Sequence, residues 1–386
     1  MFAANSKNMS LQTVSDFLDP VSLSAISGDE GFKHTQLGRH VAIYDESFPD
    51  VTEADVVLIG CGEMRGAGPD YRDWDSADSI RREFYALYHW HESVRLADLG
   101  NIRRGASLQD TYAALKTVVT ELVAIGKKVV ILGGSHDITL AQYQAQAGLQ
   151  KLIEVTCIDA GIDLDMSSPL PSENFLMEML TGEPNYIRHY NHIGFQSYLV
   201  HPQMLQTIDK LHFDCYRVGR VKENLEEMEP VIRNSNLLSV DISAIQHAHA
   251  PANKLTPNGF TGEEMCTLMQ YAGLSPSLNT LGIYGYYSAN DEHSLTAKQI
   301  SHMLWYFMDG LHKGKEEASF EDRNSFHEFH LAFAEVETIF LQSKRTGRWW
   351  MQLPSGQFTG CSKNDYIIAS SNDIPERWLR AVERDS

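Results

Sequence analysis

Short apolar runs alternate with helical segments through most of this 386-residue chain. The runs within residues 54–64 and 128–137 pass directly into glycine, which is typical of buried strands that enter a loop. Between them, residues 110–128 place apolar side chains at helical spacing and stop at Gly126. Strands and helices in alternation imply a mostly parallel sheet covered by helices on both faces. We therefore predict a three-layer α/β/α fold, and we expect one of its later strands at residues 212–221.

The pattern divides the chain into three parts. Residues 1–45 are mixed and polar, and we expect an N-terminal extension there. Residues 46–314 carry the strand–helix alternation and should form the α/β domain. The periodicity weakens near Lys315, so we expect residues 315–386 to be a small C-terminal extension packed on the main domain.

The C-terminal extension has a composition of its own. Residues 337–354 indicate two strands joined by a turn at Arg345, Thr346 and Gly347, and residues 373–386 indicate a short closing helix. We expect Trp349 and Trp350 to anchor the extension to the main domain, because paired tryptophans more often pack than form a ligand platform.

Charge and cysteine content restrict the partners and the location. The 51 acidic and 32 basic residues give a net charge of −19, whereas a nucleic acid or an anionic membrane would require a basic face. The five cysteines form no CxxC pair, which argues against a zinc knuckle or a disulfide framework. The N-terminus lacks a secretory apolar core, and no apolar run reaches the roughly 18 residues of a membrane span. We expect a cytoplasmic protein with reduced thiols.

Polar residues follow three of the predicted strands. They lie in "GGSHD" (133–137), "CIDAGIDLD" (157–165) and "SVDIS" (239–243). Because ligands gather at the carboxyl ends of parallel strands, these side chains should meet at one edge of the sheet. The four expected there are His136, Asp159, Asp163 and Asp241. Carboxylates with a single imidazole suit Mn²⁺, Mg²⁺ or Fe²⁺ better than a structural zinc ion.

The three motifs, in this order, resemble the metal motifs of the ureohydrolases, the group that contains arginase, agmatinase and formimidoylglutamase. The resemblance covers roughly residues 50–310 and includes "ADLGNI", "SENFL" and "PNGFTGEE". "GGSHD" is similar to the formimidoylglutamase version, and the chain as a whole resembles a divergent bacterial branch of that group. The resemblance implies an arginase-like fold, hydrolysis of a C–N bond in a linear amidine, and two Mn²⁺ ions that share a bridging hydroxide.

Matched position by position, the resemblance implies that the first metal site is complete and the second is not. The four ligands of the first metal correspond to His136, Asp159, Asp163 and Asp241. Gly161 and Ser243 stand where the second metal has its own histidine and aspartate. We therefore expect one divalent cation, Mn²⁺ by resemblance, and no second metal. Three carboxylates and one neutral imidazole around one divalent ion sum to −1, an acceptable balance.

The residues that act on the substrate in the family are also altered. The proton-shuttling histidine would fall near Leu176, and the glutamate that meets the guanidinium would fall near Gly285. Asn174 matches a substrate-contacting asparagine, although a lone asparagine in a loop is more often a turn residue. His247 and His249 follow the third motif and either reach toward the second metal position or are surface loop histidines.

Three interpretations follow. The chain is a ureohydrolase-like enzyme with altered or lost activity, acting on a small guanidino or formimino compound, and by resemblance a homo-oligomer. Alternatively, it is a non-catalytic binding or assembly module on the same fold. A nucleotide-binding α/β protein is the third interpretation, but GxxxxGK[ST] is absent and no GxGxxG follows a strand.

Overall fold

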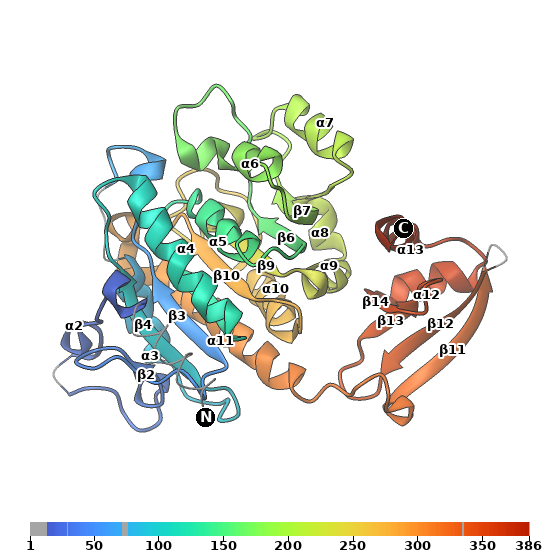
Figure 1. Ribbon diagram of the computed structural model, residues 1–386, viewed down its shortest axis with the longest axis horizontal. Helices are drawn as coiled ribbons and strands as arrows, with labels where there is room; N and C mark the ends of the chain where they lie inside the picture. Colours follow the sequence, from blue (N-terminus) through green and yellow to red (C-terminus); the bar gives the residue numbers. More distant parts are fainter. Residues whose placement is uncertain (1–13, 29, 72–75, 334–335, 386) are drawn as a thin grey trace.

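The computed structural model describes residues 14–385 except for residues 29, 72–75 and 334–335. In this part of the chain, ten strands form the main sheet. They are β1 (Leu18–Asp19), β2 (Ala42–Ile43), β3 (Val56–Gly60), β4 (Leu96–Ile102), β5 (Lys128–Leu132), β6 (Ile153–Ile158), β7 (Ile187–Phe195), β8 (Asp214–Arg217), β9 (Leu237–Asp241) and β10 (Thr280–Tyr284). Their order is β1-β4-β3-β5-β10-β9-β6-β7-β8, with β2 also paired to β4 (Figure 1).

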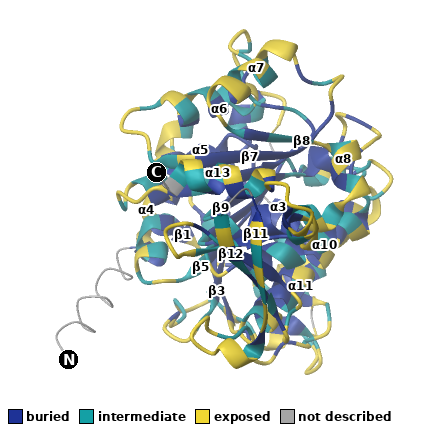
Figure 2. Cartoon of the chain, turned by 90° about the vertical axis from the view of Figure 1, so that its right-hand side faces the viewer, coloured by how far each residue is buried: buried dark blue, intermediate teal, exposed yellow. Residues whose placement is uncertain are grey.

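Helices cover both faces of this sheet, which confirms the predicted three-layer fold. One face carries α3 (Ser76–Tyr85), α8 (Val218–Glu223), α9 (Met228–Asn234), α10 (Gly262–Leu274) and α11 (Leu295–Gly314). The other carries α4 (Leu108–Ala124), α5 (Ile138–Ala147), α6 (Pro171–Thr181) and α7 (Pro202–Lys210). The strands between the two helical layers are buried (Figure 2). None of the described helices is both long and apolar enough to cross a membrane.

Short helices complete the connections. They are α2 (Leu23–Ser27) and the 3₁₀ turns η1 (Ser15–Phe17), η2 (Leu37–Arg39), η3 (Arg65–Ala67), η4 (Leu225–Glu227), η5 (Ile242–Ala244), η6 (Ser288–Asn290), η7 (Glu292–Ser294) and η8 (Arg323–Ser325). In the N-terminal region, β1 pairs antiparallel and β2 parallel with β4, so this region joins the edge of the main sheet.

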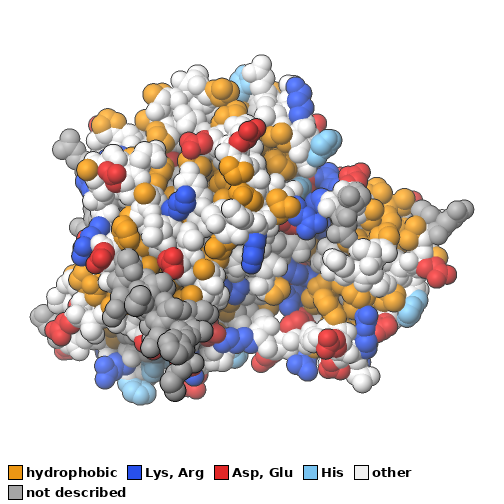
Figure 3. Space-filling model, viewed as in Figure 1, with side chains coloured by type: hydrophobic (Ala, Val, Ile, Leu, Met, Phe, Trp, Pro, Cys, Tyr) orange, Lys and Arg blue, Asp and Glu red, His pale blue; other side chains and the backbone are white. Residues whose placement is uncertain are grey.

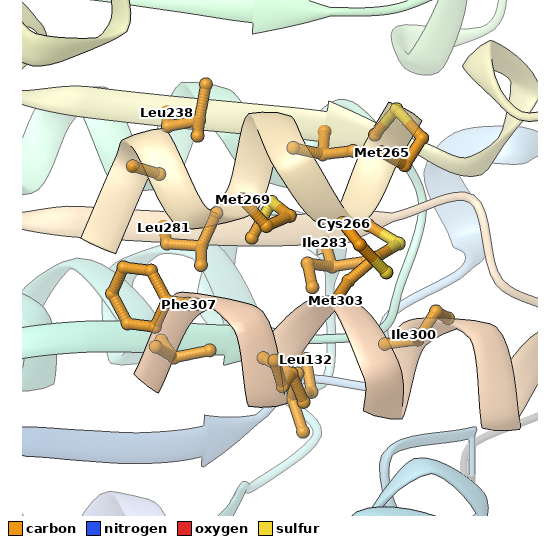
Figure 4. Packing of buried hydrophobic residues seen from close by; sticks show 14 of the residues in the cluster. Leu132, Leu238, Met265, Cys266, Met269, Leu281, Ile283, Ile300, Met303 and Phe307 are labelled. Carbon is orange, nitrogen blue, oxygen red and sulfur yellow. The ribbon is translucent and has the colours of Figure 1, made fainter. Parts of the chain in front are cut away.

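Local sequence explains where the longer helices begin and how they pack. Ser107 caps α4 and Thr261 caps α10, each in a reciprocal capping box with the third helical residue. Helices α10 and α11 approach closely because a side chain at Gly273 would collide with the Phe307 carbonyl oxygen. Figure 4 shows how their apolar side chains pack toward the strands; labelled are Met265, Cys266, Met269, Ile300, Met303 and Phe307 over Leu132, Leu238, Leu281 and Ile283.

The strand register brings the carboxyl ends of the central strands to the same level. Ile283 of β10 lies beside Leu132 of β5, and Tyr284 lies beside Asp241 of β9. Val240 of β9 in turn lies beside Ile158 of β6. The loops that carry the three sequence motifs therefore leave the sheet at one edge, as the sequence predicted.

The C-terminal residues form a second, antiparallel sheet that projects from the main body (Figure 1). Its strands are β11 (Phe326–Phe333), β12 (Val336–Ser343), β13 (Trp349–Gln352) and β14 (Phe358–Cys361), followed by α12 (Lys363–Ser370) and α13 (Glu376–Asp385). The predicted hairpin corresponds to β12 and β13, and Gly347 supplies the positive φ of their turn. Strands β11 and β14 and helix α12 were not predicted from the sequence.

One sequence-based assignment is wrong in part. Residues 212–221 were expected to be a strand, but β8 ends at Arg217 and α8 begins at Val218. Val218 and Val221 are spaced by three residues and both pack against the same apolar core. This short apolar stretch therefore satisfies a helical turn as well as an edge strand.

Trp349 and Trp350 are packing residues, as expected. Both are buried, and Arg233 of α9 donates a hydrogen bond of 2.7 Å to the Trp349 carbonyl oxygen. The guanidinium groups of Arg233 and Arg348 lie 4.5 and 5.3 Å from the ring centroid of Trp350. Arg348 also donates to the Leu274 carbonyl oxygen at the end of α10, at 3.0 Å. These contacts join the second sheet to the main body.

Candidate metal centre

Four side chains from three loops meet at the carboxyl edge of the main sheet. His136 follows β5, Asp159 and Asp163 follow β6, and Asp241 ends β9. The Nδ1 atom of His136 lies 2.6 Å from Asp163 Oδ2, 3.4 Å from Asp159 Oδ2 and 4.0 Å from Asp241 Oδ2. His136, Asp159 and Asp163 each offer one ligand atom within 4.8 Å of the others. The structure thus brings together all four residues that the sequence singled out.

The orientation of His136 is fixed by groups on its other side. Its Nε2 atom is hydrogen-bonded at 3.0 Å to the hydroxyl of Ser239, which also bonds to Thr139 at 2.6 Å. The rings of Phe175 and Tyr284 pack against the imidazole, with centroids 5.0 and 6.1 Å away. Nδ1 is therefore the atom that faces the carboxylates. Sequence reasoning missed Ser239, although a serine two residues before Asp241 on an apolar strand shares its face.

The two oxygens of Asp159 and of Asp241 have different partners. Oδ1 of Asp159 accepts hydrogen bonds from the Ser243 hydroxyl and, at 3.3 Å, from the Gly161 amide. Oδ1 of Asp241 accepts from the Ser243 amide at 2.7 Å. In both residues it is Oδ2 that faces His136. Ser243 thus donates to one oxygen of each aspartate and Gly161 to the same oxygen of Asp159, which leaves the other oxygen of each residue directed into the cluster.

Crowding of buried carboxylates shifts their protonation. Burial and the negative charge of Asp159 raise the pKa of Asp163 to about 7 and the pKa of Asp241 to about 6. Burial opposes ionisation of Asp159 too, but the hydrogen bond and charge of His136 lower its pKa to about 2. Burial alone would lower the pKa of His136, whereas its hydrogen bonds to Asp159 and Asp163 raise it well above the ordinary value.

This donor set fits a divalent cation. One imidazole nitrogen and two carboxylate oxygens lie close together, and Asp241, outside that group of three, directs a third oxygen toward them, 4.0 Å from His136 Nδ1. Burial and the neighbouring negative charge of Asp159 raise the pKa values of Asp163 and Asp241. A cation held there would favour the ionised form of all three acids. Oxygen-rich ligation with one imidazole is the pattern that Mn²⁺ accepts.

Asp165 of the second motif and Asn174, which lies in helix α6 and not in a loop as expected, both point elsewhere. Asp165, the third acid of "CIDAGIDLD", accepts hydrogen bonds from the amide and hydroxyl of Ser167, at 2.9 and 2.6 Å. Asn174, the predicted substrate contact, donates its amide to the Ser168 carbonyl oxygen at 2.8 Å. Its contact with a substrate stays a prediction.

The remaining positions of interest surround the cluster. Leu176 is a residue of α6, and its side chain is buried in the core. Gly285 has a positive φ of 75°, and a Cβ atom there would lie 2.4 Å from Asp241 Oδ2. A side chain at Gly285 would therefore have to displace that carboxylate and adopt a strained positive φ. The ring of exposed His247 bonds to the Asn253 carbonyl oxygen at 2.7 Å, and neither it nor His249 belongs to the group of possible metal ligands found among the described residues.

Sequence comparison identifies related proteins. A model of the arginase family matches residues 66–309, more than half of the chain. The chain is 28% identical to a formimidoylglutamase of Hahella chejuensis over 182 residues, and 29% identical to one of Staphylococcus haemolyticus over 111 residues. These alignments cover 42% and 28% of this chain, and they span 55% and 36% of the lengths of the two relatives.

Solved structures show the same fold. A Trypanosoma cruzi formiminoglutamase solved with Mn²⁺ aligns with a TM-score of 0.63 at 15% identity, over 68% of this chain and 95% of that one. The formimidoylglutamase of Bacillus subtilis aligns with a TM-score of 0.64 at 18% identity, over 73% and 94%. At this identity the likeness establishes the fold, and the family match establishes descent. The chain belongs to the arginase family.

Proposed function

We propose that this protein uses a single divalent cation, Mn²⁺, to hydrolyse a C–N bond of a small formimino or guanidino compound. The observation that carries this proposal is the convergence of His136 Nδ1 with the Oδ2 atoms of the three aspartates. The curated relatives that are formimidoylglutamases, and the solved relative with Mn²⁺, support the substrate class and the metal.

The hydrogen bonds of Ser243 and Gly161 support one cation rather than two. In this arrangement each donor bonds to Asp159 Oδ1, and Ser243 also bonds to Asp241 Oδ1. Protein N–H and O–H groups thus compensate the charge on the side of these aspartates that faces away from His136. Ser243 and Gly161 also bring no imidazole and no carboxylate, so a second cation would lack ligands of its own.

The chain's own residues prepare the site in three ways. Ser239 fixes the imidazole so that Nδ1 is directed inward. Ser243 orients the carboxylates of Asp159 and Asp241. Phe175 and Tyr284 pack on His136 and exclude water from that side of the ring. A bound divalent cation would lower the pKa of water and polarise the amidine carbon–nitrogen bond, although three anionic ligands make it a weaker Lewis acid than a site of neutral ligands.

Metal content and product release test the proposal together. We expect one Mn²⁺ per chain after reconstitution and dialysis, and release of formamide or urea from formimidoylglutamate, arginine or agmatine. Asp241→Ala should abolish both the bound metal and the activity, while Asp165→Asn, which alters an acid outside the cluster, should retain both. Two Mn²⁺ per chain would contradict the one-cation site. Full metal loading with no turnover of any of the three substrates would instead establish a non-catalytic binding or assembly module.

Other predictions from the sequence remain part of the proposal. They are the domain boundaries at residues 45 and 314, a homo-oligomeric state, a cytoplasmic location, and the absence of nucleic-acid and membrane partners. Size-exclusion chromatography with light scattering tests the oligomeric state directly.

A further inference from the structure

A large cavity lies away from the metal centre, between the main sheet and the C-terminal part of the chain. Its volume is about 890 Å³, within the range of cavities that hold metabolites. One wall comes from β7, β8, α8 and α9, and the opposite wall comes from α12 and α13. Figure 3 shows Lys and Arg side chains gathered along this junction. The side chains of the metal centre do not contribute to the described lining.

Helix α13 presents an apolar face and a basic face. Trp378 and Ala381 pack into the core of the C-terminal sheet. Arg377, Arg380 and Arg384 are spaced by three and four residues, which places them on one side of the helix, and all three line the cavity. The chain therefore directs three guanidinium groups of one helix toward the main body.

Two of these arginines have carboxylate partners. Arg377 donates to Asp365 at 2.9 Å and to Glu227 at 3.2 Å. Arg380 pairs with Asp214 and, at 2.6 Å, with Glu376. Their positive charges are compensated by the protein, and they hold α13 against β8 and η4.

Three other groups in the cavity form no ion pair with a carboxylate among the described residues. The hydroxyl of Tyr216 and the guanidinium of Arg220 make no hydrogen bond or ion pair within the described part of the chain. Arg384 donates through Nε to the Arg380 carbonyl oxygen at 2.9 Å, and its terminal nitrogens have no partner among the described residues. Tyr216 and Arg220 belong to the main body and Arg384 to α13, so the three groups face the cavity from both walls.

The surroundings of Tyr216 are electropositive. Burial and the charge of Glu376 raise the pKa of its hydroxyl, and the charges of Arg377, Arg384 and Arg220 act in the opposite direction. Burial lowers the pKa of Arg384; Glu154 and Tyr216 oppose this shift, and the positive charges of Arg188 and Arg377 add to it. An anion beside Tyr216 would relieve this repulsion.

We propose that the cavity binds a small organic anion through a carboxylate or phosphate group, which Tyr216, Arg220 and Arg384 hold by hydrogen bonds. Guanidinium groups bind both oxyanions in a planar, two-pronged geometry, and a phenol hydroxyl adds a third donor. The ligand bridges the main body and α13, so its binding links the C-terminal part to the arginase-like core. This inference does not depend on the proposed hydrolase activity.

The acidic side chains of the cavity define the orientation of this ligand. Asp214, Glu227, Asp365 and Glu376 are engaged by Arg377 and Arg380. Glu154, Asp209 and Glu226 remain in the lining. The anionic group therefore lies at Tyr216, and the remainder of the ligand extends toward Asp209 and Glu226, whereas the charge of Glu154 acts on Arg384.

Binding of two probes to the full chain tests the proposal. Inorganic phosphate and succinate are titrated separately by calorimetry and by thermal unfolding, each at concentrations up to about 10 mM. We expect saturable binding and a rise in Tm for at least one of them, because a ligand that bridges the two parts stabilises the folded state. Phosphate binding alone would assign the site to phosphorylated ligands, and succinate binding alone would assign it to carboxylates.

Three variants locate the binding. Arg220→Gln and Tyr216→Phe should each weaken the affinity by about tenfold or more, since each removes a donor to the anion without removing a partner of another residue. Arg217→Gln changes an exposed arginine outside the cavity lining and should leave the affinity unchanged. Asp163→Asn should also retain binding, because the metal centre is separate from the cavity. Absence of saturable binding by both probes, or binding that Arg220→Gln and Tyr216→Phe leave intact, would overturn the proposal.

Discussion

Asp163 at the metal centre and Glu317 at the junction with the C-terminal sheet are both largely buried carboxylates, and their pKa values shift in opposite directions. Asp163 lies beside Asp159 and Asp241, and burial together with the charge of Asp159 raises its pKa to about 7. Burial would also raise the pKa of Glu317, but hydrogen bonds from Ser343, Thr346 and Arg348 hold it below its ordinary value.

The two pKa shifts differ in direction because the two regions differ in the positive charges placed beside the buried carboxylates. At the junction, Glu317 and Glu229 face the guanidinium groups of Arg348 and Arg233, so the protein supplies its own counter-charge. At the metal centre, the aspartates form ion pairs with His136 alone among the described residues, and no guanidinium group is paired with them. Carboxylates that the fold gathers without guanidinium partners indicate a site for an external cation rather than a structural ion-pair network.

Arg233→Ala should produce the largest effect, because it removes a counter-charge from the junction with the C-terminal sheet. The change removes the partner of Glu229, a hydrogen bond to the Trp349 carbonyl oxygen and the stacking on Trp350. Because Glu229 would remain buried with only Arg348 near it, at 3.9 Å, we expect a loss of about 3–5 kcal/mol in the free energy of unfolding. Chemical denaturation measures this loss. Metal binding should persist in the folded fraction.

A surface ion pair provides the matched control. Arg95 pairs with Glu53, and both side chains are mostly exposed. Arg95→Ala should cost less than about 1 kcal/mol, because solvent screens the pair. Equal effects of Arg233→Ala and Arg95→Ala would contradict a structural role for the junction network.

The sequence predicted the central fold and the four clustered residues for the same physical reason. Buried parallel strands need continuous apolar runs, and these runs end where glycine or a polar residue begins. His136, Asp159 and Asp241 each follow such an end, so the topology alone brings them to one edge. The segment at Val218 was misassigned because a few apolar residues satisfy both a strand and a helical turn.

Other features depend on contacts that no local pattern reveals. The bond from Ser243 to Asp159 joins residues 84 positions apart, and the role of Ser239 depends on the position of His136 in another loop. The cavity at Tyr216 requires α13, about 160 residues later in the chain, to return to β8. Strand β11 has the sequence FHEFHLAF, in which apolar and polar residues do not alternate strictly, so the two-residue period of a half-buried strand is absent.

Asp159→Asn should disrupt the carboxylate cluster at the metal centre. It removes a negative charge that faces His136 and contributes to the raised pKa of both Asp163 and Asp241. We expect Mn²⁺ affinity to fall by at least about 100-fold, measured by equilibrium dialysis. The metal-free variant should also be less stable than the metal-free parent, because ionised Asp159, whose pKa is lowered to about 2, is lost as a partner of His136. Retention of parental affinity would exclude Asp159 as a ligand, and Asp165→Asn serves as the control.

A change of pH should affect the stability contributions of the two regions in opposite directions. In the metal-free chain the pKa of Asp163 is raised above its unfolded value, so its ionisation costs stability increasingly as pH rises from about 4 to about 7. The pKa of Glu317 is lowered, so its contribution to stability is present above its ordinary pKa and is lost as pH falls.

The pH dependence of Mn²⁺ affinity is a second test of the raised pKa values at the metal centre. Because His136, Asp163 and Asp241 must all be unprotonated to bind a cation, affinity should rise about tenfold per pH unit for each proton released, and the raised pKa of His136 extends this rise above about pH 7. Calorimetry in buffers of different ionisation enthalpy counts the protons. Arg233→Ala should leave this pH profile unchanged, whereas a flat profile between pH 5 and 7 would contradict the raised pKa values.

Ser243→Ala should have the smallest effect and the most specific one. Its hydroxyl lowers the pKa of Asp159 by donating to Oδ1, while the Ser243 amide that bonds Asp241 is retained in the variant. We expect Mn²⁺ affinity to fall by less than about tenfold, with one cation still bound per chain. Ser243→Thr keeps the hydroxyl and should restore the parental affinity. Binding of two cations per chain by Ser243→Ala would contradict this expectation. It would mean that the Ser243 hydroxyl prevents a second cation from binding, and that the lack of ligands at positions 161 and 243 does not.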